Sequence, residues 1–175
     1  MAVVIVAAPD GAANSYLTLA EAEIYMEEIL NASEWDTALD DTKNRALVTA
    51  TLFLDPLRWK GQKVDSLTAN ALRWPRAYVY NQDGQLYDSA SIPSLIKKAT
   101  AWLAFELIKT DRVTDVGVNA QNGEKRAKVG PLEVEYFEGS NDGSYLDRIP
   151  YNIRDLIAPF LNSTSGWGSA SLVRG

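Results

Sequence analysis

The sequence of 175 residues contains neither cysteine nor histidine. The absence of cysteine excludes disulfides, thiolate metal sites and cysteine nucleophiles. The absence of histidine removes the commonest general base, the usual zinc ligand and the middle member of a Ser-His-Asp triad. Any catalysis would depend on carboxylates, lysine, tyrosine or a borrowed metal. We therefore expect a protein that is not an enzyme and that holds no metal and no cofactor.

Long hydrophobic runs are also missing. Residues 1–8 are apolar, but this run is short and lacks the basic start of a signal peptide, and no run approaches the roughly 20 apolar residues of a membrane span. Its valine content favours an extended strand, or an arm exchanged between subunits. We expect no membrane partner and synthesis in the cytoplasm.

Positive charge is in short supply overall. The formal net charge is −6 and the isoelectric point is about 4.7. An acidic protein repels phosphates unless its positive charge is segregated, so free-standing binding of duplex DNA is not expected. An acidic surface lining a passage for DNA would instead let the duplex slide without specific binding.

Helix signals dominate the first two thirds of the chain. Thr18 and Glu21 form a capping box that predicts a helix to about Asn31. Ser33 is expected to cap a short turn that carries Trp35. Further helices are predicted from Asp40 to Pro56, from Ser66 to Pro75, after a proline at the first helical position (Pro93), and from Pro150 to Leu161.

A β-ribbon is predicted between the last two of these helices. Residues 125–129 and 132–136 flank Gly130 and Pro131, and apolar residues alternate with Glu133 and Glu135 in the second segment. A ribbon with one polar face offers strand edges to neighbouring subunits. The residues assigned to such pairing are Lys128, Leu132, Val134 and Tyr136.

Together these patterns predict a mainly α fold. The core is a compact helical bundle with a small protruding β-ribbon, a C-terminal helix and an extended C-terminal arm. The expected boundaries are an N-terminal strand or arm (1–13), the bundle (14–110), a loop and ribbon excursion (111–148), the last helix (149–161) and the arm (162–175).

Paired carboxylates are the remaining candidates for metal or acid–base chemistry. Asp40 and Asp41 are better interpreted as a favourable negative charge at a helix start, and Glu133 and Glu135 as a solvated strand face. Neither pair has a third acid at a recognisable spacing. Residues 117–123 are rich in glycine and asparagine but lack the Lys-Ser/Thr pair of a phosphate loop.

Residues 58–80 combine aromatic and basic side chains. The stretch contains five cations and a single acid, Asp65. Basic residues beside aromatic platforms are typical of proteins that bind single strands without sequence preference. The other interpretation makes the tryptophans core anchors, with basic neighbours that cover them or pair with acids of an adjacent subunit. The candidate platform consists of Trp59, Trp74, Tyr78, Arg73 and Arg76.

The last fourteen residues are rich in glycine and serine and have no helical or strand period. Such a segment buries too little apolar surface to offset its ordering entropy by itself. We expect an arm that docks on a partner. Its anchors would be Trp167, Leu172, Val173 and Arg174.

Several short motifs, in a fixed order, resemble a phage family often labelled DnaT-like single-stranded DNA-binding protein. They are Asn14-Ser-Tyr-Leu-Thr-Leu-Ala-Glu-Ala-Glu23, Leu52-Phe-Leu-Asp55, Trp59-Lys-Gly61, Ala71-Leu-Arg-Trp-Pro-Arg76, Ile92-Pro93, Lys128-Val-Gly-Pro-Leu-Glu-Val-Glu-Tyr136 and Leu172-Val-Arg-Gly175. Each motif alone is weak, but together they span nearly the whole chain.

Members of that family look like head–tail adaptors of long-tailed phages. The resemblance implies a virion protein of the phage neck, assembled in the host cytoplasm as a ring of usually twelve copies beneath the portal protein. It implies ring neighbours, a downstream stopper or tail-completion protein, and an arm that grips the portal or a neighbour. The family has no catalytic residues to transfer.

Two other functions remain open from the residues. One is a replication accessory that binds single-stranded DNA through the 58–80 stretch, as the family label suggests. The other is a nuclease that uses carboxylates and a metal, which the sequence supports weakly. Substitution of Trp74 separates the first from a core role, because a core tryptophan would cost stability instead of binding.

Overall fold

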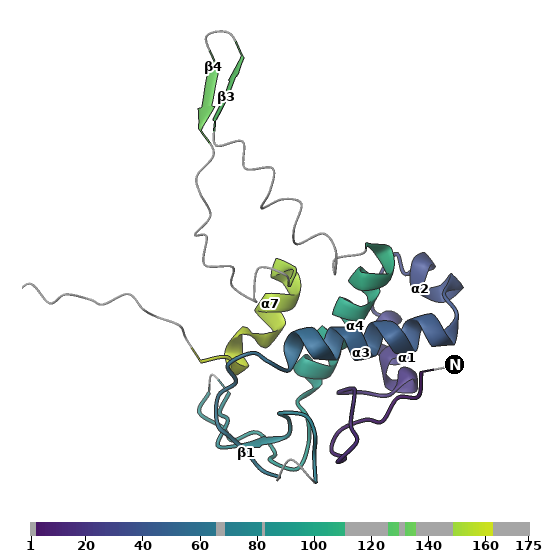
Figure 1. The fold of residues 1–175 in the computed structure, drawn as a ribbon. Coiled ribbons are helices and arrows are strands. Elements are labelled where there is room, and N and C mark those ends of the chain that lie inside the picture. Colours follow the sequence, from purple (N-terminus) through teal and green to yellow (C-terminus); the bar gives the residue numbers. More distant parts are fainter. Residues whose placement is uncertain are drawn as a thin grey trace, which may run out of the picture.

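The computed structural model describes residues 3–65, 69–81, 83–110 and 149–162, together with the backbone of residues 126–129 and 132–135. Its described part is mainly helical, as the sequence predicts (Figure 1). The helices are α1 (Leu19–Met26), α2 (Ser33–Thr37), α3 (Asp40–Leu54), α4 (Ser94–Lys109) and α7 (Tyr151–Ile157), which continues into a 3₁₀ turn, η2 (Ala158–Phe160).

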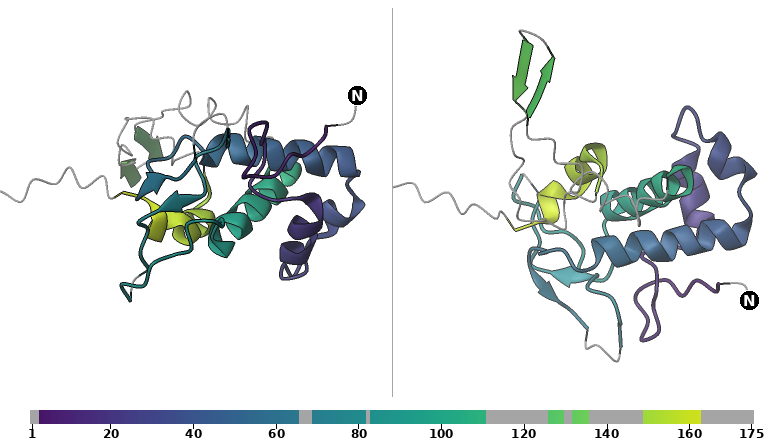
Figure 2. Two further views of the ribbon diagram at one scale, coloured as in Figure 1. Left: turned by 90° about the horizontal axis from the view of Figure 1, so that it is seen from below. Right: turned by 45° about the horizontal axis from the view of Figure 1, so that its top comes forward.

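The two longest helices, α3 and α4, pack side by side and form the centre of the body. The helix α1 packs on both, α2 packs on α4, and α7 packs on α4 near the far end of α3 (Figure 2). The apolar spacing of α3 and α4 explains this arrangement, because one stripe of each helix faces the other. Fully buried side chains at these contacts include Leu47, Leu54, Ile96, Leu103, Ile153 and Ile157.

The start of α1 confirms the sequence prediction. Glu21 N donates to Thr18 Oγ1 at 3.2 Å, and Thr18 N donates to Glu21 Oε2 at 2.8 Å, which completes the capping box. The helix ends at Met26, however, instead of near Asn31. Leu30 is 96% exposed, so a helix continued to this residue would gain no burial from its side chain.

Three other predicted helix starts need correction by one residue. Ser33 is the first residue of α2, and the capping position is Ala32, without a side-chain cap. Pro93 and Pro150 occupy the capping position of their helices and not the first helical position. Both prolines have extended ψ values, 139° and 146°, which the capping position requires and which a proline φ permits equally well.

The prediction for the C-terminal helix was too long. The α-helix ends at Ile157, and the chain tightens into η2, which contains Pro159. Proline has no N–H to donate and therefore interrupts the α-helical hydrogen-bond ladder. The start of α3 at Asp40 and its end before Pro56 agree with the sequence.

The helix predicted from Ser66 to Pro75 is wrong for residues 69–75, which form loop; residues 66–68 lie outside the described part. Asn70 is the physical reason. Its Nδ2 donates to Trp74 O at 2.6 Å, and its Oδ1 accepts from Leu72 N at 3.1 Å, so its side chain takes the place of helical partners. The sequence analysis also missed the short antiparallel pair β1 (Gln62–Lys63) and β2 (Arg76–Ala77).

The N-terminal segment is extended from residue 3 but makes a single bridge, Ala7 to Ser15, and no regular strand within the described residues. It lies along its own chain. Val3 N donates to Asp41 Oδ1 at 2.8 Å, and Asn44 Nδ2 donates to Val3 O at 3.2 Å. The start of α3 therefore holds this segment, and its exchange between subunits stays a prediction.

The predicted ribbon forms from β3 (Arg126–Val129) and β4 (Leu132–Glu135), paired antiparallel. The register sets Arg126 opposite Glu135 and Lys128 opposite Glu133. The other two pairs, Ala127 with Val134 and Val129 with Leu132, join apolar residues. Tyr136, the turn at residues 130–131 and the excursion at residues 111–123 lie outside the described residues.

Candidate nucleic-acid interface

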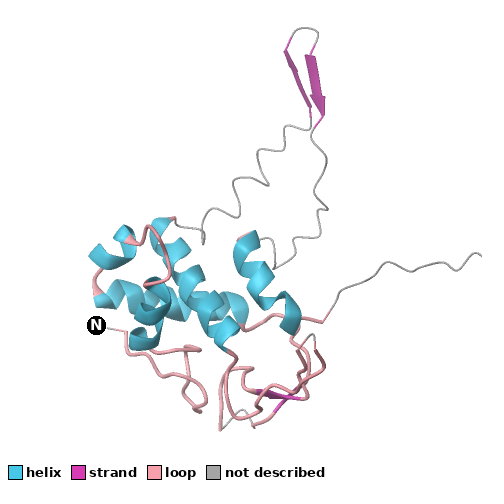
Figure 3. Cartoon of the chain, turned by 180° about the vertical axis from the view of Figure 1, so that it is seen from behind, coloured by secondary structure: helices cyan, strands magenta, loops and turns pink. Residues whose placement is uncertain are grey.

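The predicted platform for single-stranded DNA lies in a layer of loops that connects the end of α3 to the start of α4 along the chain. Residues 55–65, 69–81 and 83–92 form this layer at the end of the body where α3 ends, next to η2 (Figure 3). The β1–β2 pair holds its two halves together. The platform can bind bases only if its aromatic faces and its cations point into solvent.

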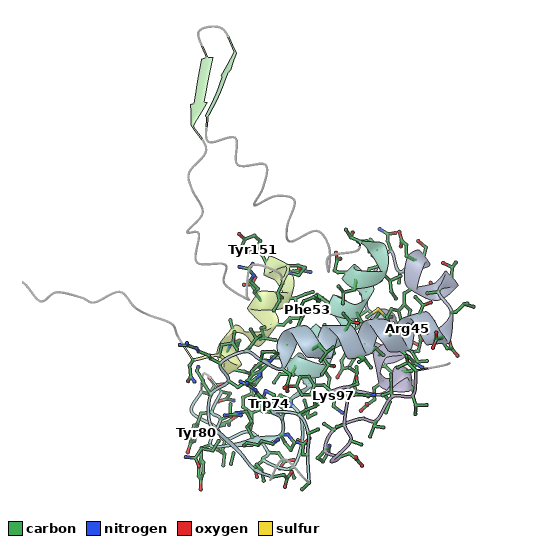
Figure 4. The ribbon with its side chains drawn as sticks, in the orientation of Figure 1. Arg45, Phe53, Trp74, Tyr80, Lys97 and Tyr151 are labelled. Carbon is green, nitrogen blue, oxygen red and sulfur yellow. The ribbon has the colours of Figure 1, made fainter. Side chains whose placement is uncertain are left out.

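Both tryptophans point inward instead. Trp59 is 4% exposed and Trp74 is completely buried. Their rings meet edge to face with centroids 5.6 Å apart, and Trp74 meets Phe160 in the same way at 5.8 Å. Figure 4 shows Trp74 where the loops meet the helices and Tyr80 at the outer edge of the loops. The Trp74 Nε1 atom has no hydrogen-bond partner among the described residues, so this side chain contributes through apolar packing. The structure thus gives these two residues the core-anchor role.

Two lysines of the stretch tie the loops to neighbouring backbone. Lys60 Nζ donates to Pro159 O at 2.8 Å, which joins the loop layer to η2. Lys63 Nζ donates to Asn70 O at 2.5 Å, which joins β1 to the loop around Asn70. Both side chains are half-buried, and their ammonium groups satisfy carbonyl oxygens that would otherwise lose hydrogen bonds.

The two platform arginines act in the same way. Arg76 Nε donates to Lys60 O and its Nη2 to Gly61 O, both at 2.7 Å. Partial burial lowers the pKa of Arg76 from its ordinary value, yet it stays well within the protonated range. Arg73 donates through Nη1 to Pro56 O and Leu57 O, both at 3.3 Å. These guanidinium groups close the loops onto the end of α3.

Asp55 is the structural residue that the sequence analysis missed. Its Oδ1 accepts from the hydroxyl of Tyr16 at 2.5 Å and from Arg73 N at 2.7 Å, and its backbone oxygen accepts from Trp59 Nε1 at 3.1 Å. Burial and the neighbouring Asp55 raise the pKa of Tyr16 well above its usual range. A signal existed in the sequence: a carboxylate at a helix C-terminus opposes the macrodipole, so it needs a tertiary partner.

Some side chains of the stretch do face solvent. Tyr78 is 64% exposed and Tyr80 is 53% exposed, and Arg58 is also exposed. Tyr80 makes an antiparallel bridge with Leu86, which is 57% exposed, at the base of the predicted turn closed by Gly84. Tyr78 has φ of 60°, a left-handed conformation that a tyrosine adopts at a cost. Of the five platform residues, Trp59 and Trp74 are therefore buried, Arg76 is half-buried, and Arg73 and Tyr78 are exposed.

The carboxylate candidates serve the fold. Asp41 accepts from Val3 N and pairs with Arg45 Nε at 2.9 Å; these two hydrogen bonds lower the pKa of its carboxyl group. Asp40 is exposed at the start of α3. Among the described residues, no three acids come together as a possible metal site. In that part of the chain, no helix has both the length and the apolarity to cross a membrane.

The other predicted sites are placed only in part. Lys128, Leu132 and Val134 belong to the paired strands β3 and β4. The arm residues Trp167, Leu172, Val173 and Arg174 lie outside the described residues, as does Tyr136.

Comparison with known proteins gives one match. A family model with the description "Putative DnaT-like ssDNA binding protein" matches residues 1–175, the whole chain. Neither the curated proteins nor the solved structures contain a significant match.

Proposed function

We propose that this chain, which belongs to the family of putative DnaT-like ssDNA-binding proteins, serves as a structural head–tail adaptor of a tailed bacteriophage. In this role it forms a dodecameric ring under the portal protein and extends the DNA channel. It connects the capsid vertex to a stopper or tail-completion protein. It is a virion component that contacts duplex DNA without binding it specifically.

The burial of Trp59 and Trp74 is the observation that carries this proposal. Bases can stack only on exposed aromatic faces, and these two faces pack on each other and on Phe160. The neighbouring cations are engaged with backbone carbonyls of the loops. The most DNA-like stretch of the sequence is thus used for folding, which favours a structural role over strand binding.

The ribbon and the composition add support. A two-stranded hairpin is marginally stable by itself, so β3 and β4 would gain stability from a neighbouring subunit or the portal. The net charge of −6 suits a channel that DNA passes without sticking. A chain without cysteine or histidine also fits a structural part better than a catalyst.

Co-sedimentation with a purified ring of the portal protein from the same phage tests the proposal. The full chain is compared with a chain truncated after Asn162. The cut falls there because Asn162 N donates to Arg58 O at 2.9 Å and Asn162 Nδ2 to Trp59 O at 3.1 Å, so an earlier cut would disturb the body. Pelleting of the full chain and loss of pelleting on truncation are expected. A full chain that stays in the supernatant contradicts the adaptor role.

Single-strand binding is the alternative, because the family description names it and because Tyr78, Tyr80 and Arg58 are exposed. Trp74→Ala is a poor test of it, since this variant removes a core side chain. Fluorescence anisotropy of a labelled oligonucleotide with Tyr78→Ala and Arg58→Ala addresses the surface directly. Salt-dependent binding by the native chain that both variants weaken would favour the alternative.

A further inference from the structure

Charge is segregated along this acidic chain. Residues 27–40 contain five acids, Glu27, Glu28, Glu34, Asp36 and Asp40, and no lysine or arginine. Residues 58–80 contain five cations and one acid. We name the surface formed by the first segment the acidic end and the surface formed by the second the basic end.

These two surfaces lie at opposite ends of α3. The acidic end comprises the residues that follow α1, the helix α2 and the first residue of α3, whereas the basic end follows the last residue of α3 (Figures 1 and 2). At about 1.5 Å per residue, the 15 residues of α3 separate them by roughly 20 Å. One copy cannot bring its own two ends together.

The acidic end keeps most of its charge. Glu28 pairs with Lys98, but Glu27, Asp36 and Asp40 are exposed and make no ion pair within the described residues. Glu34 lies within electrostatic reach of Lys109, and the other paired acids nearby, Glu21 and Glu23, lie outside residues 27–40. Three carboxylates are therefore free to meet a cationic partner.

The basic end also keeps its charge, for a different reason. Lys60, Lys63 and Arg76 donate to neutral carbonyl oxygens, which satisfy their N–H groups without cancelling their positive charge. Arg58 is exposed. Of the five cations, Arg73 is the one with a carboxylate partner in the described residues, Asp55 at 4.0 Å. The adjacent turn carries two acids, Asp83 and Asp88, so the positive charge is concentrated toward residues 58–76.

Both ends also expose large apolar side chains. At the acidic end, Leu30 is 96% exposed and Leu39 is 76% exposed. At the basic end, Tyr78 and Tyr80 are each more than half exposed, as is Leu86, which forms a bridge with Tyr80. Apolar residues within a charged surround are the usual composition of a protein–protein contact.

We propose that the acidic end of one copy docks on the basic end of the next copy of this chain. The contact is heterologous, since two different surfaces meet, and heterologous contacts close into a ring when the rotation between copies permits. This inference deepens the proposed adaptor role, and it rests on that role for the expectation that the contacts close into a ring. It also assigns the exposed cations of residues 58–80 to a protein partner and not to a phosphate backbone.

Charge reversal in the full chain tests the contact. The variants are Asp36→Lys at the acidic end and Arg58→Glu at the basic end, with Asp155→Lys as control. Asp155 is an exposed acid on α7 and belongs to neither segment, and this control matches the net charge of Asp36→Lys. Self-association is measured by sedimentation velocity over a range of protein concentrations, at low and at high salt.

We expect native self-association that weakens as salt rises, and a loss of at least about tenfold in each end variant but not in the control. An equimolar mixture of Asp36→Lys and Arg58→Glu should recover native association. In an alternating chain of the two variants, every contact again joins opposite charges at these positions: native Asp36 meets native Arg58 at one contact, and the two reversed residues meet at the next.

Three results would overturn the proposal. These are a native chain that stays monomeric at every concentration, end variants that associate as strongly as the control, and a mixture that associates no better than its components. If Arg58→Glu abolishes binding to a labelled single-stranded oligonucleotide and leaves self-association unchanged, the basic end serves nucleic acid instead.

Cross-linking gives a second, independent readout, because the chain has no cysteine of its own. Asp36→Cys and Arg58→Cys, made in separate chains and mixed with a short bismaleimide, should give the mixed dimer. Asn152→Cys, at an exposed position of α7, is the control. Efficient dimers of Asp36→Cys with itself would mean a two-fold contact and would refute the head-to-tail arrangement.

The two proposals can fail separately. If the native chain pellets with the portal ring but charge reversal changes nothing, the adaptor role stands and the proposed contact is wrong. If charge reversal and mixing behave as expected but the chain ignores the portal, the contact stands and the adaptor role is wrong.

Discussion

The helical part and the loop layer use their cations in opposite ways. Between helices, lysines meet carboxylates: Lys43 pairs with Glu23 at 2.9 Å and Lys97 pairs with Glu21 at 2.6 Å. In the loop layer, lysines and arginines meet backbone carbonyls. Helices satisfy their own backbone, whereas irregular loops leave carbonyls without partners. Cations in the loops thus hold the fold, and their neutral carbonyl partners do not cancel their positive charge.

The two regions also treat tryptophan alike, despite this difference. Trp35, between helices, is completely buried, donates to Glu23 Oε2 at 2.9 Å and lies under Lys43 Nζ. Trp74, in the loops, is completely buried against aromatic rings. Tryptophan beside a cation is therefore a packing unit at both places, and its occurrence in sequence does not by itself indicate nucleic-acid binding.

Among the substitutions that test this comparison, removal of the buried loop residue Trp74 should lower the stability most. We expect Trp74→Ala to lower the free energy of unfolding by about 3–5 kcal/mol, because it empties a buried aromatic site. Tyr78→Ala, a change at a residue that is 64% exposed, should alter it by less than about 0.5 kcal/mol. Urea denaturation measures both. Equal losses in the two variants would contradict a core role specific to Trp74.

Gly61→Ala should cause the second-largest loss of stability. Gly61 has φ of 70°, and a Cβ there would lie 2.1 Å from Ala77 O and 2.7 Å from Val79 Cγ2. Backbone strain and steric overlap together predict a loss of about 2–4 kcal/mol.

Gly84→Ala is its matched control, with φ of 75° and open space around the new methyl group. The control should lose only the strain, about 1–2 kcal/mol. Thermal unfolding of the pair separates the two contributions. A Gly61→Ala variant as stable as Gly84→Ala would mean that the β1–β2 contact yields easily.

Among the helices, Glu23→Gln should cost about 1–2 kcal/mol near neutral pH, since it leaves the nearly buried Lys43 without its carboxylate while Glu23 itself is partly exposed. Partial burial raises the pKa of Glu23, but hydrogen bonds from Lys43 and Trp35 outweigh it and hold this pKa below its ordinary value.

The sign of the pH effect follows from that shift. A carboxyl group whose pKa is lower in the folded state contributes stability at neutral pH and loses it as the pH falls through its folded-state pKa. The free energy of unfolding of the native chain, measured in urea, should therefore fall in acid. The Glu23→Gln variant should lose less stability over the same pH range. Lys60→Met, which breaks a carbonyl contact in the loops, should leave the acid limb unchanged. A pH profile of Glu23→Gln that parallels the native one would contradict this account.

The smallest effect is expected at Tyr78. Its left-handed φ of 60° costs a non-glycine residue about 1–2 kcal/mol. A glycine avoids this strain, but it also makes the unfolded chain more flexible, which offsets part of the gain. Tyr78→Gly should be more stable than Tyr78→Ala by roughly 0.5–1 kcal/mol in chemical denaturation. The reverse order would mean that the tyrosine backbone is not strained at this position.

Local signals in the sequence succeeded where neighbouring residues decide the outcome. The capping box of Thr18 and Glu21, the start of α3 at Asp40 and the alternation of β3 and β4 all depend on contacts within a few residues. The Asn81 turn is of the same kind, because Asn81 Oδ1 accepts from Asp83 N and Gln85 N. The sequence analysis failed at the end of α1 and in residues 69–75. In the latter, distant partners add to the local bonds of Asn70: Ala71 N donates to Asp10 O, and Arg73 N donates to Asp55 Oδ1.

The candidate site shows the same division. Composition alone determined that the chain has no cysteine or histidine for a metal or nucleophile site, and residue order showed five cations and one acid in residues 58–80. Only the tertiary structure decided that Trp59 and Trp74 turn inward. It also decided the contacts across the loop layer, in which Arg73 N donates to Asp55 and Lys60 donates to Pro159 O. Hydrophobic patterning and charge are properties of the chain order, whereas the face that a side chain presents depends on which distant segment, here η2 with Phe160, packs against it.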